Sequence, residues 1–293
     1  MKVLLRFTLP ILLLILVIGL VNAQNLDPSG LEGGSKKDKT SYLKIQADYL
    51  TNNVFLGRAD SIITPSWSPS LGYWHKSGLY FNATANYLPT NITTSKWDNG
   101  SAELGYEFNF TEAFGGSIAF SKLFYSPTST SVKSSISSTT TLSLNYNIED
   151  ILTPTIELDY NVNKSGIPGD FLLNAGLAHD FVIPFTGDEN NMTLSPGINF
   201  NLGTQNFYKD YLLRKFKFKK IQAQVTKAID ALAPFQALDY ELSLPIVVNL
   251  GKFSLTITPT DAIAVNKLPK ALLNQYANTD NLFFTEFQVS LKF

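Results

Sequence analysis

The residues whose types could support catalysis are His75 and Ser77, in the stretch His75-Lys76-Ser77-Gly78. A serine hydroxyl beside a histidine can act as a nucleophile, with the histidine taking its proton. The only other histidine is His179, followed by Asp180, and two histidines so far apart make no metal cluster. Because the first pair stands between two predicted strands, the sequence favours a turn there over a catalytic site.

Metal and thiol chemistry have little support in the sequence. The chain has no cysteine, which excludes a disulfide framework, thiol chemistry and a cysteine-ligated metal. The stretch Gly187-Asp188-Glu189-Asn190-Asn191 offers closely packed oxygen ligands, but it lacks the spaced twelve-residue pattern of an EF-hand loop. We interpret it as a solvated turn, and the sequence predicts no cofactor and no metal site.

Carboxylates form a larger set with a shared property, since each stands at a polar position of a segment in which apolar and polar residues alternate. If these polar faces line an open lumen, their charge should favour cations. In a packed interior they would instead hydrogen-bond to Tyr, Asn and Lys side chains. Lys44 and Lys292 are the clear bases on the same faces, and both alternatives stay open. The candidate lumen-lining residues are Asp48, Glu103, Glu107, Glu157, Asp159, Asp239, Glu241 and Glu286.

The elements that must position these carboxylates are strands. Twelve segments place apolar residues at every second position, which is the period of a β-strand. The predicted strands are Leu43–Tyr49, Pro65–Trp74, Leu79–Tyr87, Ala102–Asn109, Gly116–Tyr125, Leu142–Ile148, Ile156–Val162, Phe171–Ile183, Leu194–Leu202, Leu238–Leu244, Phe253–Val265 and Phe283–Phe293.

The connections between these segments indicate a barrel. Turns on the side of the two chain ends are mostly short, while several on the opposite side are longer, as in outer-membrane barrels. Closure also leaves no unpaired backbone group facing hydrocarbon. Pro196, Pro245 and Pro259 fall inside predicted strands and imply bulges, misplaced strand ends or another strand count. The predicted fold class is all-β: a single transmembrane antiparallel up-and-down β-barrel of about 12 strands, with about 10 to 14 possible.

The segment 205–233 does not follow the strand period, and its residue types suggest a function for it. It is basic, and Ile221, Val225, Ile229 and Leu232 recur at helical spacing. One hypothesis is that it folds into the barrel as a plug, where its bases meet the acidic lining. The alternative is an outside loop that contacts lipopolysaccharide phosphates, or strand extensions that have no partner. The loop or plug candidates are Arg214, Lys215, Lys217, Lys219, Lys220 and Lys227.

The last eleven residues, FFTEFQVSLKF, carry a family resemblance. They alternate strictly and are long enough for a tilted strand to cross a bilayer, with Phe287, Val289, Leu291 and Phe293 on the apolar face. This pattern resembles the C-terminal strand of bacterial outer-membrane β-barrels, which the barrel-insertion machinery recognises. The aromatic-rich hairpins are similar to those of outer-membrane barrels in Bacteroidota-type bacteria. The resemblance implies a place among outer-membrane lipid and lipopolysaccharide, and it names no activity.

The first 40 residues precede the barrel. Residues 1–23 have a basic start, an apolar run from Leu9 to Leu20 and small residues at the expected cleavage position, which together predict a signal peptide. Residues 24–40 are rich in Gly, Ser and Lys and predict a flexible periplasmic lead. The barrel domain is therefore expected over 41–293.

Composition excludes one class of partner and fits the barrel. Removing Lys2 and Arg6 with the signal peptide leaves 21 of the 23 basic residues against 24 acidic ones, so no electrostatic argument supports nucleic-acid binding. Charged residues make up only 16% of the chain, while Tyr and Phe are abundant. A wall between lipid and water needs such a composition.

Three functions are consistent with these features. The first is a passive channel or small-solute transporter with an acidic, cation-favouring lumen. The alternative is a closed structural or scaffold barrel whose outside loops bind a partner or an envelope component. The third is an outer-membrane lipid hydrolase: the His75–Ser77 spacing is similar to the His-x-Ser element of outer-membrane phospholipases, but no Asn follows Ser77. We therefore expect a protein that is not an enzyme.

Overall fold

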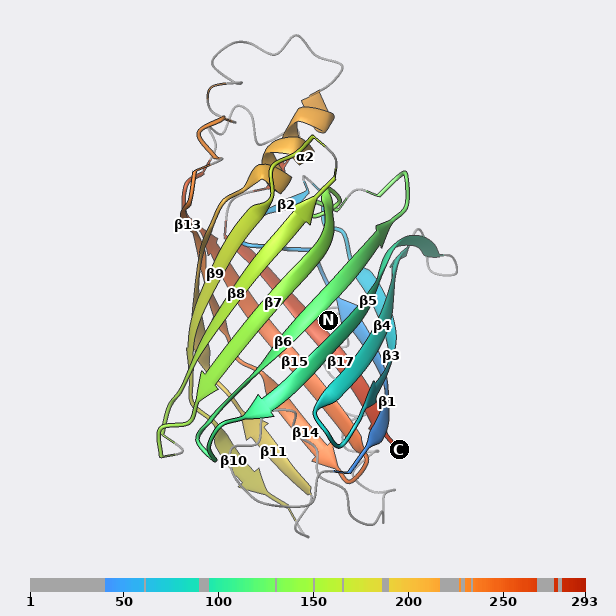
Figure 1. Ribbon diagram of the computed structural model, residues 1–293, viewed down its shortest axis with the longest axis vertical. Helices are drawn as coiled ribbons and strands as arrows, with labels where there is room; N and C mark the ends of the chain where they lie inside the picture. The colour runs from blue at the N-terminus through green and yellow to red at the C-terminus, as the bar shows by residue number, and fades with distance from the viewer. Residues whose placement is uncertain are drawn as a thin grey trace, which may run out of the picture.

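The chain folds into one closed antiparallel β-barrel (Figure 1). The computed structural model describes residues 40–60, 62–89, 95–129, 131–149, 151–164, 166–185, 190–216, 227, 230–232, 234–267, 277–278 and 281–293. The predicted signal peptide, and the predicted lead apart from Thr40, lie outside these residues.

The barrel wall has twelve strands that run between its two ends, as the alternation predicts. We call each of them a stave, because three of them are interrupted and carry two strand labels. From the N-terminal side the first seven staves are continuous: β1 (Tyr42–Leu50), β3 (Ser66–Trp74), β4 (Leu79–Pro89), β5 (Ser95–Asn109), β6 (Phe114–Tyr125), β7 (Ile136–Tyr146) and β8 (Thr153–Asn163). The eighth stave begins with β9 (Asp170–Ala178). The remaining elements of the wall are β10 (Phe181–Pro184), β11 (Asn190–Leu194), β12 (Gly197–Gly203), β13 (Gln236–Ser243), β14 (Ile246–Leu250), β15 (Phe253–Ala264) and β17 (Leu282–Lys292).

Pairing of the first and last staves closes the barrel. Strand β1 pairs with β17 from Lys44↔Lys292 to Leu50↔Glu286, and β17 pairs on its other side with β15. Every neighbouring pair in the wall is antiparallel. The wall therefore has no free edge, and its backbone groups are paired within the sheet.

The three prolines that complicate the strand count lie side by side in the wall. Three staves are interrupted there, so β9 continues as β10, β11 as β12, and β13 as β14. The carbonyl groups still accept ladder bonds: Pro196 O from His179 N (3.2 Å), Pro245 O from Ser195 N (2.9 Å) and Pro259 O from Leu244 N (3.1 Å). Breaks at one height on neighbouring staves accommodate the missing N–H groups, so the count of twelve stands.

The two ends of the barrel differ. We call the end where β1 begins and β17 finishes the terminal end, and the opposite one the loop end. The loop end carries α2 (Asn206–Phe216) and a small two-stranded sheet of β2 (Ala59–Asp60) and β16 (Ala277–Asn278). Figure 1 shows α2 above this mouth and the short turns at the other end. Among the described residues, no helix is long and apolar enough to cross a membrane.

Several boundaries differ from the sequence prediction, and β7, for example, begins at Ile136, before the predicted Leu142. Strand β5 begins at Ser95, before the predicted Ala102, and a bulge after Asn86 lets the irregular stretch Ser95–Gly100 keep pairing with β4. The helix α2 begins at Asn206, earlier than the helical spacing over 221–232 suggests. Most of that stretch lies outside the described residues.

Candidate functional site

The candidate functional site is the lumen, because the two faces of the wall have opposite character. Side chains on the outer face are large, apolar and exposed, as Leu43, Ile45, Tyr73, Phe81 and Leu104 illustrate. Their neighbours in sequence point inward and are mostly polar. The alternation read from the sequence is thus the alternation between outside and lumen.

Hydroxyl and carboxyl groups form rungs across neighbouring strands inside the barrel. On β7 and β8, Thr139 Oγ1 donates to Asn161 Oδ1 (2.6 Å), Thr141 to Asp159, and Ser143 Oγ to Glu157 Oε2 (2.9 Å). These residues are directly opposite in register, so they share the inner face. The carboxylates are solvated by short hydroxyl side chains instead of by bases.

The eight predicted acids fall into neighbouring groups on the inner face. Asp48 and Glu286 lie on the closing strands β1 and β17. Ser121 Oγ donates to Glu103 Oε2 (2.6 Å), and Trp74 Nε1 donates to Glu107 Oε1 (3.1 Å). Glu107 aside, none of the eight forms an ion pair within 4 Å with a residue that the structure describes. The remaining acids are Glu157 and Asp159 on β8 and Asp239 and Glu241 on β13.

A cavity of about 270 Å³ brings several of these groups together. Glu157, Asp159 and Glu241 line it, with the amides of Asn174 and Asn201 between them. On the loop side it is lined by Val54, Phe55 and Leu56, which belong to the connection between β1 and β3. The lumen thus holds a polar, acid-lined space that an inward-folded loop covers.

The segment 52–60, which we call the plug hairpin, forms that cover. Its tip is a two-residue turn in which Phe55 and Arg58 exchange backbone hydrogen bonds of 2.9 Å. Leu56 (φ 51°) and Gly57 (φ 66°) both have positive φ, as a type I′ turn requires. A Cβ on Gly57 would lie 2.8 Å from the Cβ of Asp239, so the hairpin packs directly on the lumen wall.

Arg58 fastens the plug hairpin and is only 1% exposed. Its Nε donates to Gln205 Oε1 (3.0 Å), and its Nη2 lies 3.4 and 3.3 Å from the carbonyl oxygens of Val265 and Asn266. The guanidinium lies 5.2 Å from the ring centroid of Tyr208. Burial lowers the pKa of Arg58 from its ordinary value, but an arginine keeps its charge.

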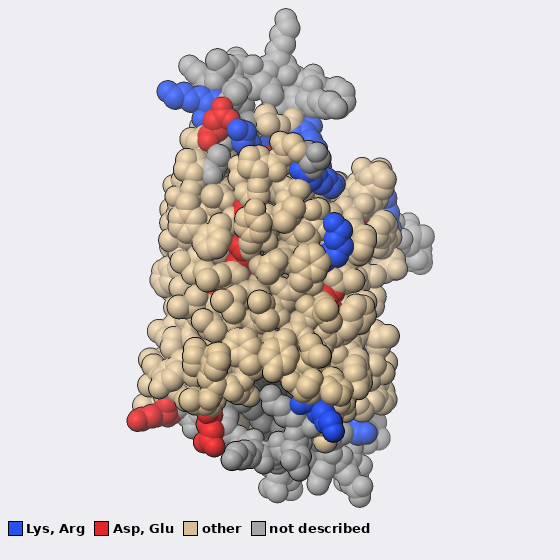
Figure 2. All heavy atoms as spheres, viewed as in Figure 1, with Lys and Arg blue, Asp and Glu red and all other residues tan. Residues whose placement is uncertain are grey.

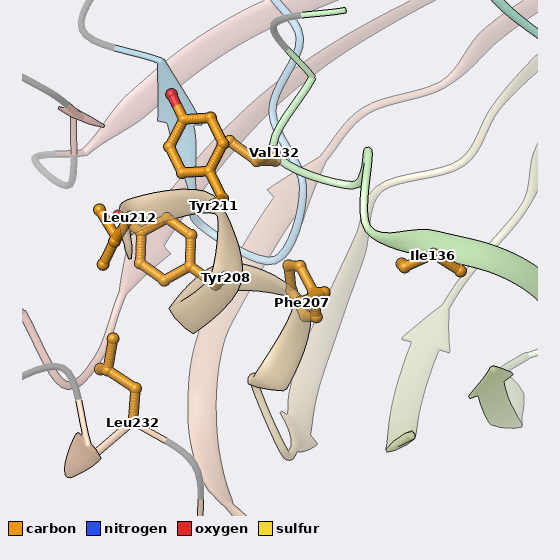
Figure 3. Close-up of a cluster of buried hydrophobic side chains, with 7 residues drawn as sticks. All are labelled: Val132, Ile136, Phe207, Tyr208, Tyr211, Leu212 and Leu232. Carbon is orange, nitrogen blue, oxygen red and sulfur yellow. The ribbon is translucent and has the colours of Figure 1, made fainter. Parts of the chain in front are cut away.

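An apolar core joins the plug hairpin to the other loops of the loop end. Figure 3 shows Phe207, Tyr208, Tyr211 and Leu212 of α2, with Val132 of the β6–β7 connection beside Tyr211. Phe55 contacts this core, and its ring meets that of Phe207 edge-on at 5.2 Å. Among the residues that the structure describes, the buried members of this core are Val132, Ile136, Phe207, Tyr208, Tyr211, Leu212 and Leu232.

Asp170 holds the start of α2. This fully buried carboxylate at the beginning of β9 accepts the backbone N–H groups of Asn206 (2.7 Å) and Phe207 (2.9 Å). Its oxygens also accept from Thr204 Oγ1 and Asn163 Nδ2, both at 2.7 Å. A side chain from the wall therefore caps the helix, satisfying N–H groups that a helix start leaves free.

The predicted basic residues do not reach the acidic lining where the structure describes them. Arg214 Nε pairs with Asp210 Oδ2 (2.8 Å), and Arg214 Nη2 donates to Ser134 Oγ (2.8 Å). Lys227 is exposed. The side chain of Lys215 and all of Lys217, Lys219 and Lys220 lie outside what the structure describes, so the role of this set stays a prediction.

The remaining residues named in the sequence analysis include the His75–Ser77 pair, the stretch 187–191 and the insertion signature. His75 Nδ1 lies 2.8 Å from Ser77 Oγ, but it also accepts the Ser77 backbone N–H (3.2 Å), so the pair forms a local exposed turn. The stretch 187–191 lies largely outside the described residues, and within them no group of three or more metal-binding side chains occurs. The residues of the predicted insertion signature all face outward, namely Phe287, Val289, Leu291 and Phe293.

The comparisons with known proteins concern the fold alone. No protein-family model and no curated protein matches the sequence. Among solved structures the chain is similar to the NanC porin (TM-score 0.45, 10% identity, covering 86% of this chain and 100% of that one). It is also similar to the KdgM porin (0.45, 8%, 85% and 98%) and to an outer membrane channel from Pseudomonas putida F1 (0.45, 10%, 92% and 100%). At these scores the likenesses carry no argument about what this chain does.

Proposed function

We propose that the protein is an outer-membrane β-barrel that forms a passive channel or small-solute transporter with an acidic, cation-favouring lumen. The observation that carries the proposal is the acid-lined cavity of about 270 Å³ inside a closed barrel, with Glu157, Asp159 and Glu241 on its surface. A lumen that served only as packing would fill such a space with side chains.

The outer wall supports a place in a membrane. Figure 2 shows a face that is almost entirely uncharged over its middle, with lysine, arginine and acidic side chains gathered at both ends. The large apolar side chains on this wall are exposed, which matches a surface covered by outer-membrane lipid. The outward-facing Phe287, Val289 and Leu291 of β17, followed by Phe293, fit recognition by the barrel-insertion machinery.

Cation preference follows from the charges on the inner face. Of the acids lining the cavity, Glu157 and Asp159 accept hydrogen bonds from hydroxyl groups. Glu157, Asp159 and Glu241 form no ion pair within 4 Å among the described residues. Lys44 and Lys292 lie at the terminal end, away from the cavity lining. A permeating cation would therefore meet several carboxylates in the middle of its path. Lys133 is a base near them, since its Nζ lies 4.9 Å from the ring centroid of Phe55, which lines the cavity.

The plug hairpin and α2 restrict this path at the loop end. They bury Arg58, Phe207 and Tyr208 in the mouth of the barrel, so passage through this end requires the hairpin to move or leaves a narrow route. This closure favours small solutes and gives the channel a low conductance in its resting form.

Reversal potential under a salt gradient tests the proposal. The purified barrel would be measured in a planar bilayer beside a plug-replaced variant, in which a short Gly-Ser turn replaces residues 54–63. That replacement is geometrically possible because Asn53 N donates to Thr64 O (2.9 Å) at the base of the segment. We expect cation preference in both proteins.

Charge removal locates the filter. Combining Glu157→Gln, Asp159→Asn and Glu241→Gln should reduce the cation preference, while Glu149→Gln, in an exposed turn at the terminal end, should leave it unchanged. Anion preference in the parent protein would contradict the acidic filter.

A closed scaffold barrel is the second candidate, and the apolar core in the mouth favours it. In that case the loops would bind a partner or an envelope component, and the lumen would carry no flux. Absence of current from both the parent and the plug-replaced barrel, with the fold intact, would support this alternative against the channel.

A further inference from the structure

Three aromatic rings form a run across adjacent strands at the terminal end of the lumen. Tyr42 on β1 is directly opposite Trp74 on β3, which is directly opposite Tyr80 on β4. The ring centroids are 5.3 and 5.7 Å apart, and the planes differ by only 5° and 12°. Parallel rings at such separations are offset, so each ring overlaps the next only in part.

Two glycines allow these rings to lie against the wall. A Cβ on Gly72 would be 2.3 Å from Trp74 Cζ3, and a Cβ on Gly105 would be 2.4 Å from Tyr80 Cζ. The rings therefore occupy the space that side chains at these two positions would fill. The rings of Trp74 and Tyr80 thus lie over glycine positions of the wall, and all three aromatic residues are only half-buried.

Charged and polar groups frame the rings. Lys292 Nζ lies 5.0 Å from the ring centroid of Tyr42, and Lys44 Nζ lies 6.0 Å from that of Trp74. The indole Nε1 of Trp74 donates to Glu107 Oε1 (3.1 Å). The aromatic surface thus has ammonium donors on one side and a carboxylate acceptor on the other.

We propose that Tyr42, Trp74 and Tyr80 form a binding platform for a cyclic sugar on its way through the lumen. A sugar ring combines an apolar C–H face with hydroxyl groups around its edge. It therefore matches an aromatic surface framed by donors and acceptors, the combination that small-molecule sites use for affinity and orientation. This inference rests on the proposed channel and names a solute class for it.

The lysines argue against an organic cation as the ligand of this platform. Two ammonium groups already lie near the ring faces of Tyr42 and Trp74, so a further cation would meet like charge there. A neutral or anionic sugar would instead gain hydrogen bonds from the same groups. The acidic filter in the middle of the lumen and the platform at its terminal end thus have separate roles.

Tryptophan fluorescence can test the platform. The chain has three tryptophans, and Trp67 and Trp97 face outward with exposures of 49% and 40%, so a Trp67→Phe/Trp97→Phe protein reports on Trp74 alone. In detergent micelles this protein would be titrated with maltose and with sorbitol, an open-chain polyol that lacks a ring face. We expect a saturable change with maltose and none with sorbitol.

Ring removal sharpens this test. Tyr42→Leu and Tyr80→Leu should each weaken maltose binding by about tenfold, in line with the loss of one aromatic contact. Tyr146→Leu, which removes an outward-facing ring, should leave binding unchanged. If either variant fails to fold, Gly105→Ala tests the same point, because its Cβ displaces the Tyr80 ring without removing it.

The outcomes separate this inference from the proposed channel. An equal response to sorbitol, or no saturable response to maltose by the folded protein, would overturn the platform. The measurement needs no flux, so a barrel that conducts ions but does not bind maltose would contradict the platform alone. A barrel that binds maltose but passes no current would contradict the channel and retain the sugar site.

Discussion

The two halves of the lumen are built from the same kind of strand but filled in opposite ways. In the loop half, aromatic and aliphatic side chains from α2, the plug hairpin and the β6–β7 connection make a buried core. In the terminal half, Tyr42, Trp74 and Tyr80 remain half-exposed on a wall of polar groups. Strand alternation therefore determines the wall, whereas segments far away in sequence determine whether the lumen is filled.

Loss of the Asp170 carboxylate should have the largest effect on the loop half. Asp170→Ala leaves the N–H groups of Asn206 and Phe207 without their acceptor. Hydrogen bonds to a charged group are each worth about 1.5–3 kcal/mol, so we expect α2 to open more easily by about 3 kcal/mol. Hydrogen exchange over 206–216 should then be roughly 100-fold faster.

The exposed Asp180 provides the control for this change. Asp180→Ala removes the same charge without touching the helix start, and it should leave the exchange of α2 as it is. Equal exchange rates in the Asp170→Ala protein and the parent would show that the cap does not hold the helix.

Arg58 comes next, since it joins the plug hairpin to Gln205, to Tyr208 of α2 and to the carbonyls beyond β15. Arg58→Met keeps the length of the side chain but loses these bonds, at a cost of about 2 kcal/mol to the closed hairpin. Because the chain has no cysteine, Leu56→Cys places a unique thiol at the hairpin tip. Labelling of this thiol should be about 10- to 30-fold faster with Met at position 58.

A thiol in the same connection controls for general changes in reactivity. Ile63 is 76% exposed, so Ile63→Cys should label at one rate whether Arg or Met stands at position 58. Arg58→Lys should give an intermediate rate, because an ammonium cannot reproduce the fork of the guanidinium. If the thiol of Leu56→Cys is labelled at the same rate with Arg, Met or Lys at position 58, Arg58 does not hold the plug hairpin closed.

In the terminal half, Gly105→Ala should disturb the aromatic run and leave the plug hairpin alone. The added Cβ would meet the Tyr80 ring at 2.4 Å, and overpacking of this kind costs about 1–3 kcal/mol. We expect a weaker near-ultraviolet circular dichroism signal. Gly197→Ala is the control, because its added Cβ meets its nearest neighbour at 3.3 Å. Equal spectra for the parent, Gly105→Ala and Gly197→Ala would contradict the geometry of the platform.

Tyr208→Phe should have the smallest effect at neutral pH, below about 1 kcal/mol, since the buried hydroxyl has no hydrogen-bond partner among the described residues. Burial raises the pKa of Tyr208 to about 12, against about 10 when exposed. The neutral ring thus stabilises the closed loop half fully below about pH 10, and this contribution is lost between about pH 10 and 12. Tyrosinate absorbance of the parent minus that of the variant should titrate near pH 12; a midpoint near 10 would contradict the burial.

The wall could be predicted from the sequence because membrane and lumen impose a period of two on every stave. All twelve predicted strands have counterparts. Pro196 and Pro245 lie at aligned breaks, and Pro259 lies in the continuous β15 beside them. The lining acids could be placed on the inner face for the same reason.

The filling of the lumen could not be predicted, because it depends on contacts between distant segments. The sequence predicts only a connection between Leu43–Tyr49 and Pro65–Trp74. In the structure Gly57 of this connection lies in a tight turn, and the side chain of Arg58 is buried. Asp170 stands at the end of a predicted loop, and its partner Phe207 is 37 residues away. In α2 the helical spacing of Phe207, Tyr208, Tyr211 and Leu212 is the signal that could have found the helix start.

Single-channel conductance of the plug-replaced barrel, beside the parent, tests most directly whether the plug hairpin closes the lumen. The control is Ile62→Ser/Ile63→Ser, which changes exposed residues of the same connection and keeps the hairpin. We predict several-fold larger unitary steps for the plug-replaced barrel, and equal steps for the control and the parent. If the plug-replaced and parent barrels conduct equally, the hairpin does not restrict the path and the proposed division of the lumen is wrong.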